Sequence, residues 1–378
     1  MDEPTQATGP LVGIRIVEMD AIGPVPLATM MLADMGADIV RVARAPTAGA
    51  AAWEDVGGAV LHRGRALVSL DLKDAADRDR LLDLIERADA LIEGFRPGVM
   101  ERLGLGPDAC LARNPRLVFG RMTGWGQSGP LAQRAGHDLN YIGLTGALHA
   151  MGDRETPPPV PLNLVGDYGG GSMVLIGGVL AALLSAQRTG RGQVVDACIT
   201  EGVISFLSLY HAWLPSGQWR DAPASNLLDG AAPFYRCYRC ADGKDVAVGC
   251  LEPRFFAQMV DGLGLGDRGY VQNDRAGWPA MEADFREAFA TRTRDEWAHR
   301  FAETDACVTP VLSMTEAAEH PHNRAREAFV ERDGVVQSAA MPKMTGTPPN
   351  VREPSETSLE HIIARWSEID PLHPPRNR

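Results

Sequence analysis

The first half of the chain alternates short apolar segments with amphipathic ones, and this alternation constrains the fold most. Val12–Met19 and Asp38–Val42 have the apolar composition of buried strands, and Pro24–Met35 between them predicts a helix that ends at Gly36. Strands that alternate with helices form parallel βαβ units, so we predict an α/β fold. The other elements expected here are strands at Leu67–Leu72, Ala90–Phe95, Leu117–Met122 and Val194–Ile199, and helices at Ala75–Ala88, Gly169–Arg188 and about 201–214.

The pattern changes after the polar stretch Pro215–Asn226. Two strand-like segments, Ala232–Cys240 and Asp245–Cys250, flank the turn Ala241–Lys244 and predict a hairpin. Helices near 254–263 and 294–304 and a strand near 306–312 follow, which indicates a smaller α+β domain. We therefore expect a large α/β domain at residues 1–214, a linker at 215–229 and a small domain at 230–324. Residues from about 325 to 378 return to the large domain.

Charge and composition exclude several classes of protein. The net charge of −12 argues against nucleic acid as a partner, because phosphate binding needs a basic surface. The longest apolar run, Ser172–Ala186, is too short for a membrane span and predicts a buried helix. The polar N-terminus has no apolar core typical of a signal peptide, so we expect a cytoplasmic protein. The segment Asp20–Pro26 lacks the glycine pattern of a dinucleotide site, which disfavours a nicotinamide or flavin cofactor.

Six cysteines are scattered along the chain, and only Cys237 and Cys240 are closely spaced. Neither a second cysteine pair nor a histidine cluster completes four metal ligands, so we expect no metal. In a strand, an offset of three residues points the two thiols to opposite faces. Structural cysteines in a reducing compartment are the favoured interpretation.

A histidine and an aspartate thirty residues apart, each after a glycine, are the candidate catalytic groups. His137 follows the strand predicted to end at Met122, and ligands of parallel sheets bind beyond the carboxyl ends of strands. Asp167 precedes Gly169, Gly170 and Gly171. We expect amides at Gly169 and Gly170 to stabilise an anion at a helix start.

Each candidate also has a structural alternative. A single histidine is more often an ordinary hydrogen-bonded residue, and Asp138 beside it would cap a helix starting at Leu139. Asp167 is equally well explained as a helix cap or as a catalytic group. For Glu252, which precedes a proline-started helix, capping is favoured from the residues alone.

Basic residues cluster near the predicted strand ends, although solvated surface charge is their default interpretation. In an acidic chain this clustering permits a phosphate-bearing ligand. The absence of a G-x-S-x-G motif disfavours an ordinary serine hydrolase. The residues are Arg41, Arg44, Arg63, Arg65, Lys73, Arg96 and Arg102.

Nearly the whole sequence resembles the class III coenzyme A transferase superfamily, and within it the α-methylacyl-CoA racemases. Asp167 before the glycines is similar to the superfamily's catalytic residue, whereas Gly136–Tyr141 resembles the racemases specifically. Asp20 departs from the pattern, because many relatives carry a small residue there. The resemblance is also carried by Leu32–Arg41, His62–Arg65, Phe95–Gly98, Glu101–Gly104, Thr123–Pro130, Leu228–Gly230 and Asp305–Val311.

The resemblance implies a Rossmann-like large domain, a small domain and an interlocked homodimer whose active site lies between subunits. It implies that His137 and Asp167 are the acid–base pair and that Glu252 joins them from the other subunit. Contacts with coenzyme A would involve Arg44, Arg102, Ile22 and Lys73.

The expected reaction is epimerisation of 2-methylacyl-CoA thioesters by proton transfer through an enolate, with no cofactor beyond the coenzyme A of the substrate. The identity of the acyl group cannot be read from the sequence. A coenzyme A transferase with Asp167 as nucleophile is the first alternative. A catalytically silent acyl-CoA-binding protein is the second.

Overall fold

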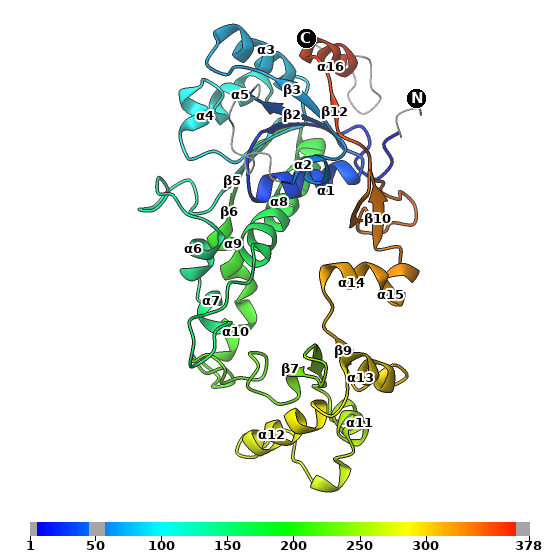
Figure 1. The fold of residues 1–378 in the computed structure, drawn as a ribbon. Coiled ribbons are helices and arrows are strands. Elements are labelled where there is room, and N and C mark those ends of the chain that lie inside the picture. The colour runs from blue at the N-terminus through cyan, green and yellow to red at the C-terminus, as the bar shows by residue number, and fades with distance from the viewer. Residues whose placement is uncertain (1–5, 45–56, 368–378) are drawn as a thin grey trace. The chain divides into compact units, whose positions relative to one another are not determined.

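The computed structural model describes residues 6–44 and 57–367, and its chain divides into two compact units (Figure 1). The large unit comprises Met1–Thr145, Val160–Leu207 and Phe329–Arg378, and the small unit comprises Gly146–Pro159 and Ser208–Ala328. The small unit therefore contains residues 146–159, 208–214 and 215–229. The expected division places the first two segments in the large domain and the third in a linker. Part of the reason is that Arg154 Nη2 donates a hydrogen bond to Ser225 Oγ at 2.6 Å, joining the first segment to the third.

The large unit is built on a seven-stranded sheet with the order β12-β3-β2-β1-β4-β5-β6, and all of its pairings are parallel. The prediction of an α/β fold with a parallel sheet is confirmed. Six strands carry the doubly wound order, which reverses between β1 and β4. The strands are β1 (Arg15–Met19), β2 (Asp38–Ala43), β3 (Arg65–Ser69), β4 (Ala90–Glu93), β5 (Val118–Thr123), β6 (Gln193–Cys198) and β12 (Ser355–Glu356).

Helices cover both faces of this sheet (Figure 1). On one face, α3, α5 and the C-terminal α16 bury leucine, isoleucine and tryptophan side chains against β1–β5, while α1 and α8 lie on the other face. Helix α16 thus completes the hydrophobic core that the first elements of the large unit begin. The helices of this unit are α1 (Pro24–Asp34), α2 (Gly58–Leu61), α3 (Ala75–Ile85), α4 (Val99–Arg102), α5 (Pro107–Arg113), α6 (Asp138–Gly143), η1 (Leu164–Met173), α8 (Val174–Thr189), α9 (Ile199–Phe206) and α16 (Leu359–Ser367). The hairpin strands β10 (Phe329–Arg332) and β11 (Val335–Ser338) belong here too.

The glycine-rich segment differs most from the expected structure. Instead of a helix that starts at Gly169, a π-helix, η1, begins at Leu164 and continues directly into α8. Together they form one apolar helical stretch, Leu164–Thr189, long enough to cross a membrane by length and composition alone. Half of its most apolar window is buried inside the protein.

The small unit has a three-stranded antiparallel sheet with the order β7-β8-β9. Its core is aromatic and includes Phe234, Phe285, Phe289 and Trp297. Cys237 is exposed and Cys240 is buried, and all six cysteines are unpaired. The elements are α7 (Ala147–Ala150), α10 (Ser208–Trp213), β7 (Tyr235–Arg239), β8 (Asp245–Gly249), α11 (Pro253–Leu263), η2 (Gly266–Arg268), α12 (Trp278–Phe289), α13 (Arg294–Phe301), β9 (Val308–Pro310), α14 (Met314–Glu319) and α15 (Pro321–Ala325).

Candidate active site

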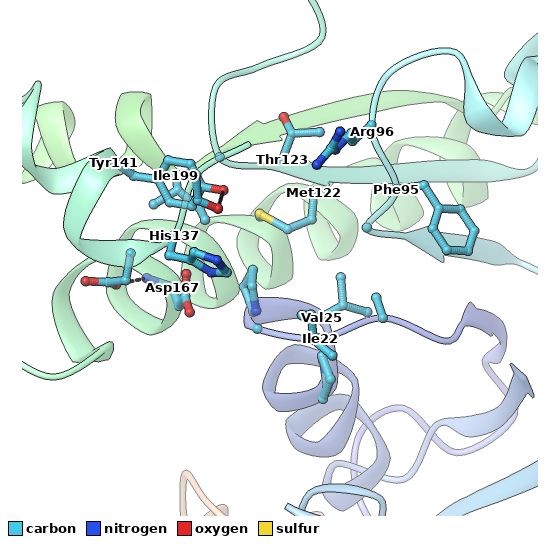
Figure 2. Close-up of a pocket in the computed structure, with 18 of the residues that line it drawn as sticks. Ile22, Val25, Phe95, Arg96, Met122, Thr123, His137, Tyr141, Asp167 and Ile199 are labelled. Atoms are coloured by element: carbon cyan, nitrogen blue, oxygen red, sulfur yellow. Dashed lines mark hydrogen bonds between the residues drawn. The ribbon is translucent and has the colours of Figure 1, made fainter. Parts of the chain in front are cut away.

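A cavity of about 660 Å³ opens at the carboxyl ends of the parallel strands, within the large unit (Figure 2). Its wall contains residues 20–26 after β1, 94–97 after β4 and 122–125 at the end of β5. Because β1 and β4 are the neighbours between which the strand order reverses, the cavity occupies the position where doubly wound sheets bind ligands. Apolar wall residues include Ile22, Val25, Met122 and Ile199.

His137 lines this cavity from the loop that follows β5. It is the N-cap residue of α6, and its backbone N–H donates to Asn140 Oδ1 at 3.1 Å, which fixes the backbone at the start of the helix. The helix begins at Asp138, so the expectation that Asp138 would cap it is wrong. Asp138 is instead buried, and its Oδ1 accepts the backbone N–H of Asp167 at 2.6 Å.

Asp167 lies inside the π-helix η1, four residues after its N-cap Asn163. It is therefore not a helix cap, and the capping alternative for Asp167 is wrong. A π-bulge or π-helix often marks a functional site, because it re-aims side chains relative to an α-helix. Figure 2 shows the Asp167 carboxylate and the His137 imidazole side by side at the cavity, and the charge of His137 influences the ionisation of Asp167.

The surroundings of Asp167 favour its neutral form. Burial is the main cause and the nearby charge of Asp138 adds to it, so the pKa of Asp167 rises to about 6. The amide of Asn163, at a long 3.5 Å, and the charge of His137 act weakly in the opposite direction. A carboxyl group with a pKa near 6 can both give and accept a proton close to neutral pH, as general acid–base catalysis requires.

The expected role of Gly169 and Gly170 in binding an anion stays a prediction. Neither residue lines the cavity, and both lie in the body of η1, where amides bond to carbonyl groups five residues earlier. Close packing is a further reason for the glycine at position 170. A methyl group on Gly170 would lie 2.6 Å from Val203 Cγ2 and 2.9 Å from the Ile199 carbonyl oxygen of α9.

Glu252 lies in the small unit, at the N-cap position of α11, and is exposed. Its backbone carbonyl accepts hydrogen bonds from Phe255 and Phe256 at 3.0 Å, but its side chain makes no capping hydrogen bond. The carboxylate is therefore not used as a helix cap, and its catalytic role stays a prediction.

The predicted contacts with coenzyme A divide into two groups. Ile22 lines the cavity and is 54% exposed. Arg44, Lys73 and Arg102 do not line the cavity; they are exposed and make no ion pair with another residue of the described ranges.

Two exposed arginines line the cavity: Arg96, which the sequence places in the basic group near strand ends, and Arg134, which it does not indicate. Neither makes an ion pair among residues 6–44 and 57–367, so both are available to an anionic ligand. Arg96 had a detectable signal, because it directly follows the strand predicted at Ala90–Phe95. Arg134 had none.

Tyr141, the last residue of the segment that resembles the racemases, is a further residue of the site, and the sequence analysis assigns it no role. Its ring packs edge-on against Trp125 with centroids 4.8 Å apart, and its hydroxyl donates to the carbonyl of Gly136. A methyl group on Gly124 would lie 2.1 Å from the Tyr141 ring, so this glycine is needed for close approach. Tyr141 therefore holds the loop that presents His137.

Comparison with known proteins agrees with this geometry. A profile of CoA-transferase family III matches residues 11–358. The chain belongs to this family. It is 40% identical to the α-methylacyl-CoA racemase of Mus musculus over 374 residues, which are 96% of each chain. It is also 40% identical to the α-methylacyl-CoA racemase of Homo sapiens, again over 96% of each chain. A CAIB/BAIF family protein from Brucella suis shares the fold, with a TM-score of 0.78, 24% identity, and coverage of 96% of this chain and 100% of that one.

Proposed function

We propose that this protein is a racemase that interconverts (2R)- and (2S)-2-methylacyl-CoA thioesters. The observation that carries the proposal is the pairing of His137 with Asp167, whose pKa is about 6, in one cavity of the large unit. The relatives named above that are 40% identical over nearly the full chain are α-methylacyl-CoA racemases, which supports the same reaction.

The proposed reaction is a proton transfer through an enolate. The thioester carbonyl acidifies the α-hydrogen, and either His137 or Asp167 removes it as a general base. The C–H electron pair becomes the enolate, and the other residue then returns a proton to the opposite face of the carbon. Each turnover exchanges the protonation states of the two residues, which restore themselves by exchange with solvent. The proposed reaction needs no cofactor besides the coenzyme A of the substrate.

The polar wall of the cavity supports a phosphate-bearing ligand. Arg96 and Arg134 are exposed cations at the cavity, and Arg44, Lys73 and Arg102 are exposed elsewhere on the large unit. We assign the phosphates of coenzyme A to these side chains, with Ile22 contacting the ligand as apolar surface.

A homodimer and a composite site are part of the proposal. Large apolar side chains are exposed on the packed helices η1, α8 and α9, including Met173, Leu184 and Phe206, which are 39%, 58% and 51% exposed. Burial of such surface against a second copy would stabilise a dimer. Glu252 would then join His137 and Asp167 from the other subunit. The six unpaired cysteines support a cytoplasmic location.

Deuterium incorporation distinguishes the racemase from both alternatives. The protein is incubated with one epimer of a 2-methylacyl-CoA in deuterium oxide, with and without a free carboxylic acid as acceptor. We expect α-deuteration and formation of the other epimer without the acceptor. Acyl exchange that requires the acceptor would identify a transferase with Asp167 as nucleophile. Thioester binding without either reaction would identify a binding protein.

Mixed dimers test the role of Glu252. Glu252→Ala and Asp167→Ala homodimers are each expected to be nearly inactive. Refolding equal amounts together gives heterodimers with one intact composite site, so activity should return to roughly a quarter of that of the wild type. Absence of recovery, with heterodimers verified by mass spectrometry, would remove Glu252 from the partner subunit's site.

A further inference from the structure

The wall of the cavity also contains a polar group that the proton transfer does not use. Asp20, Arg41 and His62 all line the cavity, from the loop after β1, from β2 and from the segment after α2. Arg41 Nε donates to Asp20 Oδ1 at 2.7 Å, and Arg41 Nη1 lies 3.0 Å from His62 Nδ1. One guanidinium thus contacts the other two side chains.

The donors and acceptors of this group assign their roles. An arginine guanidinium carries a permanent charge and only donates hydrogen bonds, so His62 Nδ1 must accept with its lone pair. The side chain of Arg41, which extends from β2, is 14% exposed. Arg41 therefore holds the Asp20 carboxylate in place and balances its charge, which would otherwise repel an anionic ligand.

One oxygen of Asp20 remains available. Its side chain is 40% exposed, and Oδ2 accepts no hydrogen bond from another residue in the part of the chain that the structure describes. Asp20 is three residues from Gly23, and a methyl group on Gly23 would lie 3.5 Å from Asp167 Oδ2. The loop that carries Asp20 therefore passes the reacting carboxylate, so a ligand that reaches Asp167 also reaches this loop.

We propose that Asp20 is a specificity residue, whose free carboxylate oxygen accepts a hydrogen bond from an N–H or O–H donor of the thioester ligand. The inference rests on the proposed function for the class of ligand. Two parts of such a ligand carry this chemistry: the amide N–H of the pantetheine arm, or a hydroxyl group on the acyl chain. A fixed, charge-balanced acceptor in a partly apolar wall would favour a ligand whose donor meets it and disfavour one that leaves it unpaired.

Binding of unreactive thioethers tests this inference without the reaction. In these analogues a CH₂ group replaces the thioester carbonyl, so the α-hydrogen is not acidic. The first arm compares an S-(2-methylalkyl)-coenzyme A with its hydroxylated counterpart. The second arm compares the same alkyl group on N-acetylcysteamine with an analogue in which an ester oxygen replaces the amide N–H. Dissociation constants are measured by calorimetry for the wild type, Asp20→Ala and Asp20→Asn.

In one arm, loss of the donor should weaken binding to the wild type by about tenfold, as for a partly exposed hydrogen bond to a charged group. The same loss should change binding to Asp20→Ala less than about twofold, so that the two effects are not additive. Asp20→Asn, which keeps an acceptor oxygen without the charge, should fall between them.

Asp83→Ala is the matched control, because Asp83 also pairs with an arginine, Arg113, but does not line the cavity. It should reproduce the wild-type dependence on the donor. Equal losses for the wild type and Asp20→Ala in both arms would overturn the inference. Donor-dependent binding together with no α-deuteration of any thioester would reject the racemase and keep the role of Asp20.

Discussion

The large unit contains two sets of buried or half-buried carboxylates, and they are held in opposite ways. At the end of α1, Asp34 contacts Arg63 Nη2 at 2.5 Å, and both side chains are 2% exposed. At the cavity, Asp167 and Asp138 have no lysine or arginine within ion-pair distance among residues 6–44 and 57–367, and the charge of Asp138 acts on Asp167. The first carboxylate is held in a buried ion pair, whereas Asp167 faces a cavity that a ligand can enter.

The difference has a physical basis. A buried carboxylate is strongly destabilised in its charged form unless a cation and hydrogen bonds compensate for lost hydration. Burial raises the pKa of Asp34 as well, but the charge of Arg63 and its two hydrogen bonds, from Nε and Nη2, act against this rise. Asp167 has no arginine partner among the described residues, and burial raises its pKa to about 6. The two carboxylates therefore differ in their partners and in access: an arginine holds Asp34 in a buried ion pair, whereas Asp167 faces the cavity.

The largest expected effect is the loss of catalysis in Asp167→Asn. The amide keeps the shape of the side chain but cannot transfer the proton. The α-deuteration of the epimer from which Asp167 removes the proton, and the interconversion of the two epimers, should therefore fall by about 10²–10⁴-fold. The rate of deuteration per folded molecule, from mass spectrometry, measures this. Normal turnover with a lower melting temperature would leave Asp167 with a purely structural role.

Asp167→Asn should lower activity but stabilise the fold relative to the wild type at high pH. Because the folded-state pKa of about 6 lies above the ordinary value of 3.8, the wild-type group contributes stability that is complete below pH 4. This contribution is lost as the pH rises through 6, where burial of the charged form destabilises the fold. Asp167→Asn does not titrate, so it should melt higher relative to the wild type at pH 8 than at pH 4.

His137→Ala should remove exchange that begins with one epimer while leaving thioester binding nearly intact. His137 and Asp167 would each act as base toward one epimer, so the variant should lose about 10²–10⁴-fold in one direction of deuteration. Initial rates from each pure epimer in deuterium oxide measure this. Equal residual rates from both epimers would remove His137 from the mechanism.

Replacement of Asp34 should lower stability and leave catalysis nearly unchanged, the opposite of the effect expected at Asp167. Asp34→Ala leaves the charge of Arg63 buried and unpaired, so the free energy of unfolding should fall by about 3–5 kcal/mol. Urea unfolding measures this change, and deuteration per folded molecule should remain close to that of the wild type. The double variant Asp34→Ala/Arg63→Met removes both charges and should recover much of the loss. Failure to recover would show that the geometry of the pair, rather than its charge balance, holds α1 against the segment before β3.

Much of this comparison could not be predicted from the sequence, although the sheet could. The apolar strands β1, β2, β4 and β5 were predicted because each is a local run of buried side chains, and His137 and Asp167 were located by the glycines before them. The π-helix was missed because its glycine at position 170 packs against α9, whose Val203 is more than thirty residues away in the chain. The contact between Asp138 and the Asp167 amide is likewise long-range, so the raised pKa had no local signal.

The smallest effect is expected for Asp138→Asn, which tests the electrostatic coupling between Asp138 and Asp167. The charge of Asp138 is the second cause of the raised pKa of Asp167, after burial. Asparagine keeps an oxygen to accept the Asp167 N–H but removes the charge, so ionised Asp167 becomes less unfavourable and its pKa should fall. Because burial is unchanged and dominates, the fall should be under about one pH unit. The acid limb of kcat/KM, in the direction where Asp167 is the base, should therefore move to lower pH by that amount.

The control is Asp83→Asn, at an exposed aspartate of the same unit, which should leave this acid limb in place. If Asp138→Asn moves the limb to higher pH, the two carboxylates share a proton rather than repel each other. Asp167 would then resemble Asp34, because a neighbouring group would stabilise its charged form, although that group is a carboxyl group rather than an arginine.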